Sequence, residues 1–503
     1  MSVPYTEPEI LWAMPPHAFN EWRATNDIPL LLAYLAETLP AFSEWEATLP
    51  FSRDVMVRIN RTSDLFKGSR EKFALKRAGD AKGEEIFECT DVPLDNGANA
   101  WRKQRGAIEF GKFLPYFAWA KLTLKSNRFF PSRKRTGEYY EDFIFNSWTG
   151  ANDGSGPTRA FLFREFAVLK IGQTVLPSGI MLGGRNLDFV DMDHLSITGD
   201  FHDSYCSAIN YSSCRELSFY DTRLHAYTFH KCAMDKLSCT RARLHDFYFE
   251  HVNIFDLKIS DCFVFRMGFT DSTITPFFSN CELRDVSFRP SSDATPFDVS
   301  TTYRLLRSAF QQSGLRREAA DSYYNERIFE RKSYFRPYTK PFNGQFPGMP
   351  YSGSLISVYA AWSRKKIQTD ELPRVIRNVL SARIKLFQPK YLVRLARYRF
   401  RWLTSLIEWL IWGYGERPSR IFAAAFVIIG IYACLYDKLS IQINPRTDWT
   451  DSIYFSMVTF STLGYGDFLP KTTLLKMLCG SEAIIGAFTM GLVVAGFSNR
   501  SRY

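Results

Sequence analysis

Residues 448–470 read DWTDSIYFSMVTFSTLGYGDFLP, and this stretch decides the fold of the C-terminal part of the chain. Asp448 or Thr450 can cap a short helix, because both side chains accept hydrogen bonds from free backbone N–H groups. The helix is predicted to end at Thr459 or Phe460. The residues that follow it, TLGYGD, therefore begin at the negative end of a helix dipole.

The segment from Thr462 to Asp467 is suited to lining a narrow ion pathway with peptide oxygens. A cation that crosses lipid needs oxygen ligands in place of its water, and backbone carbonyl groups can supply them. Adjacent carbonyl groups face one side when the backbone alternates between ordinary and left-handed dihedral angles, which glycine adopts at little cost. Gly464 and Gly466 are spaced for this alternation, while Tyr465 can pack outward against its surroundings.

Two apolar segments flank this stretch. Ile421 to Tyr436 reads IFAAAFVIIGIYACLY, and Thr473 to Phe497 reads TLLKMLCGSEAIIGAFTMGLVVAGF. The first approaches the ~20 residues that a bilayer requires, and the second exceeds that length. Basic residues flank the two ends away from the loop, so the positive-inside rule predicts a hairpin with both termini in the cytoplasm. A pair of buried helices in a soluble domain is the alternative, and the loop between the segments argues against it.

TLGYGD resembles the signature of the potassium-channel family, in which valine is most frequent at the position of Leu463. The resemblance implies four ion-binding carbonyl groups, those of Thr462, Leu463, Gly464 and Tyr465. It implies that Asp467 supports this filter from outside, next to Gly466. Because one chain supplies one wall of the filter, we expect a homotetramer that conducts K⁺ passively across the inner membrane. Neither an enzyme activity nor a cofactor is expected.

Two residues of the second apolar segment have open roles. Gly486 stands where many of these channels have a hinge glycine, and close helix packing is the alternative, because glycine commonly permits such contact in membrane helices. Glu482 either supports the filter or faces the pore as a charge. An ionisable residue within a membrane is a functional candidate by default.

A basic and aromatic segment, residues 381–417, precedes the first span. Nine basic residues stand against two acidic ones between Ser381 and Arg420, with tyrosine, phenylalanine and tryptophan interleaved. This composition predicts an amphipathic helix at the lipid interface, with anionic headgroups bound at residues 383–420. A voltage sensor is an alternative interpretation of its arginines, but the chain has no further spans before it. The basic residues are Arg383, Lys385, Lys390, Arg394, Arg397, Arg399, Arg401, Arg417 and Arg420.

From Leu217 the chain acquires a five-residue period of apolar residues. The period recurs at Phe219, Leu224, Phe229, Met234, Cys239, Leu244, Phe249, Ile254, Ile259, Val264, Phe269 and Ile274. The positions two earlier are also mostly apolar, and the pattern slips by one residue near Pro276. Two inward residues per five suit a square coil whose layers stack as parallel strands. This pattern resembles the pentapeptide-repeat family, whose fold is a right-handed β-helix, and we expect that domain at residues 176–292.

The remaining segments complete a multidomain chain. We expect residues 300–336 to form a helical hairpin that caps the β-helix, and residues 337–380 to form a linker. We expect residues 418–503 to form an all-α pore domain with two spans. Residues 1–175 form an N-terminal domain of unknown role, with helices near Ile10 to Glu37 and a hairpin over Phe73 to Cys89. Together these parts resemble a bacterial two-transmembrane potassium channel with an N-terminal pentapeptide-repeat domain.

Composition limits the other classes of function. The 46% apolar content excludes a disordered chain, and nine cysteines without a CxxC pair predict neither disulfides nor a metal site. The net charge of +11 fits a belt of basic residues beside an anionic membrane, so no nucleic-acid partner is expected. The start MSVPYTEPEI lacks the features of a signal peptide, which predicts a cytoplasmic N-terminal domain. We expect this domain to control gating by binding an unknown ligand or protein. Two other functions are considered for the chain. One is a membrane-tethered interaction protein, and the other is a β-helix that mimics DNA.

Overall fold

The computed structural model of the chain describes most of an N-terminal region, a β-rich central region and a helical C-terminal region. The described residues are 6–66, 73–79, 85–91, 108–124, 168–200 except 181, 207–291, 294–335, 388–439 except 418, and 448–501, with a few helical residues between 373 and 384. They form two compact units. The first comprises Met1–Ala294 with Ser352–Ala382, and the second comprises Thr295–Tyr351 with Arg383–Tyr503.

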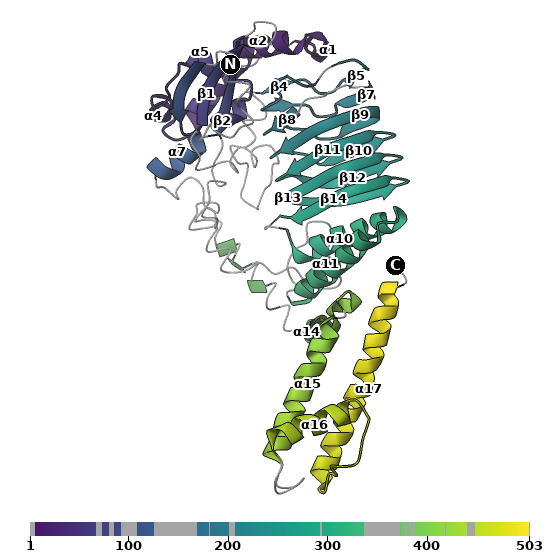
Figure 1. The fold of residues 1–503 in the computed structure, drawn as a ribbon. Helices are drawn as coiled ribbons and strands as arrows, with labels where there is room; N and C mark the ends of the chain where they lie inside the picture. The colour runs from purple at the N-terminus through teal and green to yellow at the C-terminus, as the bar shows by residue number, and fades with distance from the viewer. Residues whose placement is uncertain are drawn as a thin grey trace. The chain divides into compact units, whose positions relative to one another are not determined.

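Parallel strands wound into a stack of coils form the main part of the first unit (Figure 1). The strands are β4 (Leu169–Lys170), β5 (Val175–Leu176), β6 (Val190–Asp191), β7 (Ser196–Asp200), β8 (Ser207–Asn210), β9 (Leu217–His230), β10 (Lys236–Thr240), β11 (Arg243–Glu250), β12 (Asn253–Ser260), β13 (Phe263–Ser279) and β14 (Glu282–Pro290). Leu237 pairs with Leu217 on one side and with Leu257 on the other, so four five-residue repeats make one coil. The predicted β-helix is confirmed.

The predicted slip of one residue is also present. Ile254 of β12 pairs with Ile274 of β13, twenty residues later, whereas Leu257 pairs with Pro276, nineteen residues later. The register change lies between these two pairs and persists in the next coil, where Phe263 pairs with Glu282. The chain thus loses one residue at a corner and keeps its apolar residues inside.

Inward aromatic rings and left-handed corners hold the coils together. Phe249 stacks between Phe229 and Phe269, with ring centroids 5.2 and 4.9 Å away, close to the ~4.8 Å spacing of neighbouring strands. The chain turns most corners at polar residues with positive φ, among them Asp221 (51°) and Asp246 (57°). Asp tolerates the left-handed region better than most residues, which explains the polar position in each repeat.

Helices and a small sheet make up the N-terminal part of the first unit. The elements are α1 (Pro8–Ala13), α2 (Pro16–Asn26), α3 (Ile28–Thr38), α4 (Phe42–Glu46), α5 (Arg53–Val57), η1 (Thr62–Leu65), β1 (Phe73–Gly79), β2 (Glu85–Asp91), β3 (Ile108–Phe113) and α7 (Tyr116–Thr123). The predicted hairpin is present as the antiparallel pair β1 and β2, and β3 adds a third strand beside β1. The predicted helices over Ile10 to Glu37 are present as α1, α2 and α3.

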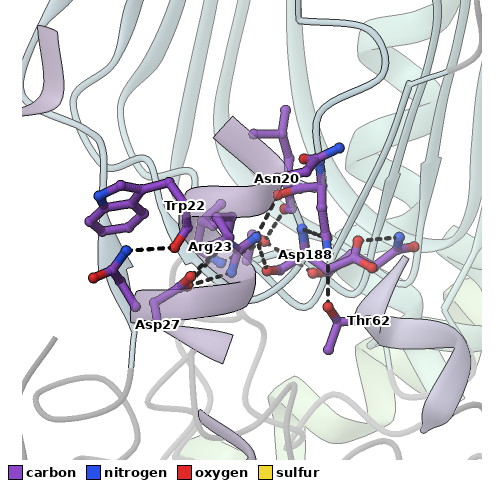
Figure 2. Close-up of polar contacts among 12 residues, drawn as sticks. Asn20, Trp22, Arg23, Asp27, Thr62 and Asp188 are labelled. Atoms are coloured by element: carbon purple, nitrogen blue, oxygen red, sulfur yellow. Dashed lines mark hydrogen bonds and ion pairs between the residues drawn. The ribbon is translucent and has the colours of Figure 1, made fainter. Parts of the chain in front are cut away.

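A buried polar network joins the N-terminal helices to the first coils (Figure 2). Arg23 of α2 pairs with Asp27 at 2.7 Å and also donates to the backbone carbonyl groups of Asn186 and Asp188. The carboxylate of Asp188 accepts from the backbone N–H of Ser63 at 2.8 Å. Burial of unpaired charges would cost several kcal/mol, so each partner depends on the others. The two regions therefore share one interior, which the sequence analysis did not predict.

The second unit is helical. It contains α10 (Pro296–Gln312), α11 (Arg316–Phe335), α14 (Pro389–Trp412), η3 (Gly413–Gly415), α15 (Ser419–Lys438), α16 (Trp449–Phe460) and α17 (Thr473–Ser501). Helices α10 and α11 form the predicted hairpin, and α11 packs against α14. The role of this hairpin as a cap of the β-helix stays a prediction. Among the residues that the structure describes, two helices are long and apolar enough to cross a membrane, at Ser419–Lys438 and Thr473–Gly496.

Candidate functional site

The short helix α16 leads directly into the TLGYGD segment. It begins with a capping box, in which Asp448 caps the first turn and Asp451 accepts the backbone N–H of Asp448 at 3.2 Å. At its end the N–H of Leu463 donates to the carbonyl of Val458 at 3.1 Å. The N–H of Thr462 donates to the carbonyl of Thr459 at 3.0 Å, which completes a Schellman motif. Both predicted ends of this helix are thereby confirmed within one residue.

The backbone after α16 alternates in the way that the carbonyl geometry requires. Thr462, Gly464 and Gly466 have φ values of 56°, 55° and 80°, and neither Leu463 nor Tyr465 between them is left-handed. Glycine accounts for two of the three positions at little cost. A β-branched threonine in the left-handed region is a strained exception, of the kind that costs about 1–3 kcal/mol and persists mainly at functional sites.

The alternating segment lies at the surface of the single chain. The side chain of Leu463 is 60% exposed and that of Tyr465 is 68% exposed. Asp467 receives the backbone N–H of Phe468 at 3.2 Å and lies beside the hydroxyl of Tyr454 in α16. The described part of the chain thus braces the segment from the side of α16 and leaves its other side open.

Gly486 is a close-packing position between α17 and α16. A Cβ atom added to Gly486 would lie 1.9 Å from the carbonyl oxygen of Phe460, the last residue of α16. A methyl group cannot fit at that distance, so the two backbones approach as they do only at a residue without a side chain. This geometry supports the close-packing alternative for Gly486, and the hinge stays a prediction.

Glu482 is fully buried where three helices meet. The hydroxyl of Tyr436 in α15 donates to one carboxyl oxygen at 2.7 Å, and the hydroxyl of Ser456 in α16 donates to the other. A second hydrogen bond joins α15 to α17, between the hydroxyl groups of Tyr432 and Ser481, which are 2.9 Å apart. Within the single chain, Glu482 faces the other helices and is shielded from solvent.

Sequence reasoning singled out Glu482 and missed its partners. Tyr432 and Tyr436 are one helical turn apart in the first span, and Ser456 lies on the buried face of α16. Hydroxyl groups at helical spacing within apolar segments were the available signal, because a polar group in such a segment must find a partner. The choice of partner depends on how the three helices pack, which their separate sequences do not encode.

Comparisons with known proteins match limited stretches of the chain. A family model described as an ion channel matches residues 421–502. A potassium channel protein, kcv, of Paramecium bursaria Chlorella virus 1 is 45% identical over 53 residues, which are 10% of this chain and 55% of that protein. A putative potassium channel protein, YugO, of Bacillus subtilis (strain 168) is 29% identical over 104 residues, 19% of this chain and 30% of its own length.

A third relative is a two pore potassium channel, c, of Oryza sativa subsp. japonica. It is 31% identical over 78 residues, which are 15% of this chain and 17% of that protein. The chain therefore spans from about a sixth to about half of the length of these curated relatives. The matched residues 421–502 include both apolar helices, α16 and the TLGYGD segment, so these residues are similar to an ion channel domain.

Proposed function

We propose that this chain is one subunit of a potassium channel. The alternation of left-handed residues from Thr462 to Gly466 carries the proposal, because it turns successive carbonyl groups toward one side. The segment follows the C-terminal end of a short helix, whose dipole favours a cation there. Three relatives of this chain bear potassium-channel names, which supports K⁺ as the permeant ion.

We infer that four copies surround one axis. A single row of carbonyl groups supplies only part of the oxygen shell that a dehydrated cation needs, so the pathway is incomplete without symmetry-related copies. The open side of the segment, where Leu463 and Tyr465 are exposed, supports such an arrangement. In the assembled channel the carbonyl groups of Thr462, Leu463, Gly464 and Tyr465 bind K⁺, and Gly466 and Asp467 hold the outer end.

Residues behind the filter keep the short helix in place. Glu482 holds α16 and α15 through hydrogen bonds from Ser456 and Tyr436. Of the two roles considered for Glu482, these bonds favour support of the filter over a charge that faces the pore. The segment 381–417 lies at the membrane surface, where its basic residues meet anionic headgroups and the exposed apolar residues Phe400 and Leu410 enter the lipid. Both termini lie in the cytoplasm, and the two spans cross an inner membrane. The first compact unit controls gating.

Flux measurements on the purified full-length protein test this function. Liposomes that contain the protein should take up K⁺ down its gradient at least about tenfold faster than Na⁺. Gly464→Ala places a side chain at a left-handed position and should abolish selective flux. Gly480→Ala is the matched control, because a Cβ atom there meets no atom of the chain within 4 Å.

The same samples separate the proposal from a membrane tether. A tether predicts that the wild type conducts no K⁺ and that Gly464→Ala changes nothing. A monomer in light-scattering measurements would contradict the shared pathway. Removal of residues 1–294 tests the gating role, because it should change the open probability in single-channel recordings and leave the ratio of K⁺ to Na⁺ permeability unchanged. Unchanged gating would reject that role.

A further inference from the structure

The connection between α14 and α15 is a tight left-handed turn around a buried tyrosine. Gly413, Tyr414 and Gly415 have φ values of 58°, 60° and 88°. The side chain of Tyr414 is 5% exposed, and its hydroxyl lies 3.0 Å from that of Ser405 in α14. Its ring packs edge-on against Tyr324 of α11, with centroids 6.2 Å apart. Burial raises the pKa of the Tyr414 hydroxyl, so it stays protonated in this contact.

Three arginine side chains lie on aromatic rings beside this turn. The guanidinium carbons of Arg331 in α11 and Arg420 in α15 lie 4.6 and 4.8 Å from the ring centroid of Trp409. That of Arg417 lies 4.3 Å from the ring centroid of Tyr324. The indole N–H of Trp409 donates to the hydroxyl of Tyr324 at 3.1 Å, so the two rings form one platform. Arg420 already donates from Nη1 to the carbonyl of Trp409 at 2.8 Å and from Nη2 to the hydroxyl of Tyr324 at 3.3 Å. Because each Nη atom carries two hydrogens, the stacked guanidinium groups keep further N–H groups at their edges to donate.

In the described part of the chain, none of these three side chains forms an ion pair. Arg327, the neighbouring arginine of α11, pairs with Glu330 and with Glu408 of α14 at 3.3 Å. Among the residues that the structure describes, no carboxylate lies within ion-pair distance of Arg331, Arg417 or Arg420. In the same described ranges, Nη1 of Arg331 has no hydrogen-bond acceptor. The platform therefore gathers three cations that lack an anion.

The turn itself provides space for two of these arginines. A Cβ atom added to Gly413 would lie 2.9 Å from Cβ of Arg417 and 3.5 Å from Cδ of Arg420. The glycine thus serves both the left-handed turn and the close passage of the two side chains. Arg420 is the second residue of the first apolar span, Ser419–Lys438, and tryptophan side chains such as Trp409 are typical of the lipid interface.

We propose that Arg331, Arg417 and Arg420 form a binding site for the phosphate group of an anionic lipid headgroup. Guanidinium groups bind phosphate through pairs of charge-assisted hydrogen bonds, and three of them without a carboxylate match its negative charge. The lipid is favoured over a soluble phosphate compound because the site lies at the first turn of a membrane span. This placement rests on the proposed function. A bound phosphate would join α11 to the start of α15 and thereby connect the helical hairpin to the pore.

Binding of a fluorescent phosphatidic acid analogue to the detergent-solubilised full-length protein tests this site. The wild type should bind saturably, and the variants Arg417→Gln and Arg420→Gln should each weaken binding by at least about tenfold, the loss expected for one charge-assisted hydrogen bond to a buried or stacked partner. Arg331→Gln should do the same. Arg241→Gln is the matched control, because Arg241 also stacks on a single ring, that of Tyr220 at 4.5 Å, and lies in the β-helix outside the basic segment. It should bind within about twofold of wild type.

The outcomes separate the source of the phosphate and the function of the chain. Displacement of the analogue by phosphatidylglycerol but not by inorganic pyrophosphate supports a lipid site. Saturable binding of pyrophosphate with no binding of the lipid overturns the lipid assignment. Equal losses in Arg417→Gln and Arg241→Gln overturn the site itself. Because this assay measures binding alone, it is independent of K⁺ flux, whose absence from liposomes of any lipid would instead refute the proposed function.

Discussion

Replacement of Gly486 by alanine tests how firmly α17 holds the short helix that precedes the proposed filter. The added Cβ atom would lie 1.9 Å from the carbonyl oxygen of Phe460 and 2.8 Å from its carbonyl carbon. Cβ contacts below 3.0 Å essentially do not occur, so the end of α16 must retreat by 3.0 − 1.9, or about 1.1 Å. Overpacking of this kind typically costs about 1–3 kcal/mol of stability. The shift reaches the left-handed Thr462, which is only two residues after Phe460.

The assay compares K⁺ and Na⁺ flux in liposomes that contain equal amounts of each variant. Gly486→Ala should lose at least about tenfold of its K⁺ flux or most of its selectivity, because a displacement near 1 Å is large for a preorganised site. Gly480→Ala and Gly491→Ala lie in the same helix, and a Cβ atom at either meets no atom of the chain within 4 Å. Alanine favours helix by ~1 kcal/mol over glycine, so both controls should be as stable as wild type or more so.

Three results would refute this reasoning. If Gly486→Ala conducts with wild-type selectivity and unfolds at the wild-type temperature, the contact with Phe460 does not limit the pore. If selectivity and stability persist while the open probability falls in single-channel recordings, Gly486 acts as a hinge and the close-packing account fails. Loss of flux in all three variants would show that α17 tolerates no added methyl group, and that the contact has no special role.

Further predictions concern the two buried polar networks. Glu482→Leu should destabilise helices α15–α17 by about 1–3 kcal/mol, because the hydroxyl of Tyr436 loses its carboxylate acceptor, while that of Ser456 can still donate to the carbonyl of Ile429 at 3.0 Å. Glu482→Gln should retain most of the stability in thermal unfolding of the full-length protein. Arg23→Met should cost about 3–5 kcal/mol, because Asp27 would stay buried as an unpaired charge, and the double variant Arg23→Met/Asp27→Leu should recover much of this loss in denaturant titrations. Equal stability of the single and double variants would contradict a coupled pair.

The sequence carries the features of the fold that are local or periodic. The five-residue period predicted the β-helix and even its slip near Pro276, because each coil buries the same two positions of every repeat. The ends of α16 were predictable from Asp448 and from the start of TLGYGD, since caps depend on neighbouring residues. The spacing of Gly464 and Gly466 likewise predicted their left-handed backbone.

Contacts between distant residues were not predictable in this way. Arg23 reaches the carbonyl group of Asn186, which is 163 residues later, so no local pattern identifies the pair. Thr462 shares the left-handed backbone of the two glycines although threonine rarely adopts it, and only the end of α16 imposes that conformation. The sequence predicts only that Arg417 and Arg420, like the other basic residues of this segment, lie at the lipid interface. Their stacking on Tyr324 and Trp409 emerges only when α11 packs beside α14.

The twenty-residue coil has a consequence for changes in chain length. Because Leu217, Leu237 and Leu257 lie directly above one another, inserting or removing a whole coil would change the height of the stack by one strand spacing and preserve the facing of every later side chain. A single extra repeat of five residues would instead advance the rest of the chain by one side of the square, a quarter of a turn. A graft of one whole coil from another such protein should therefore be tolerated where a graft of one repeat is not.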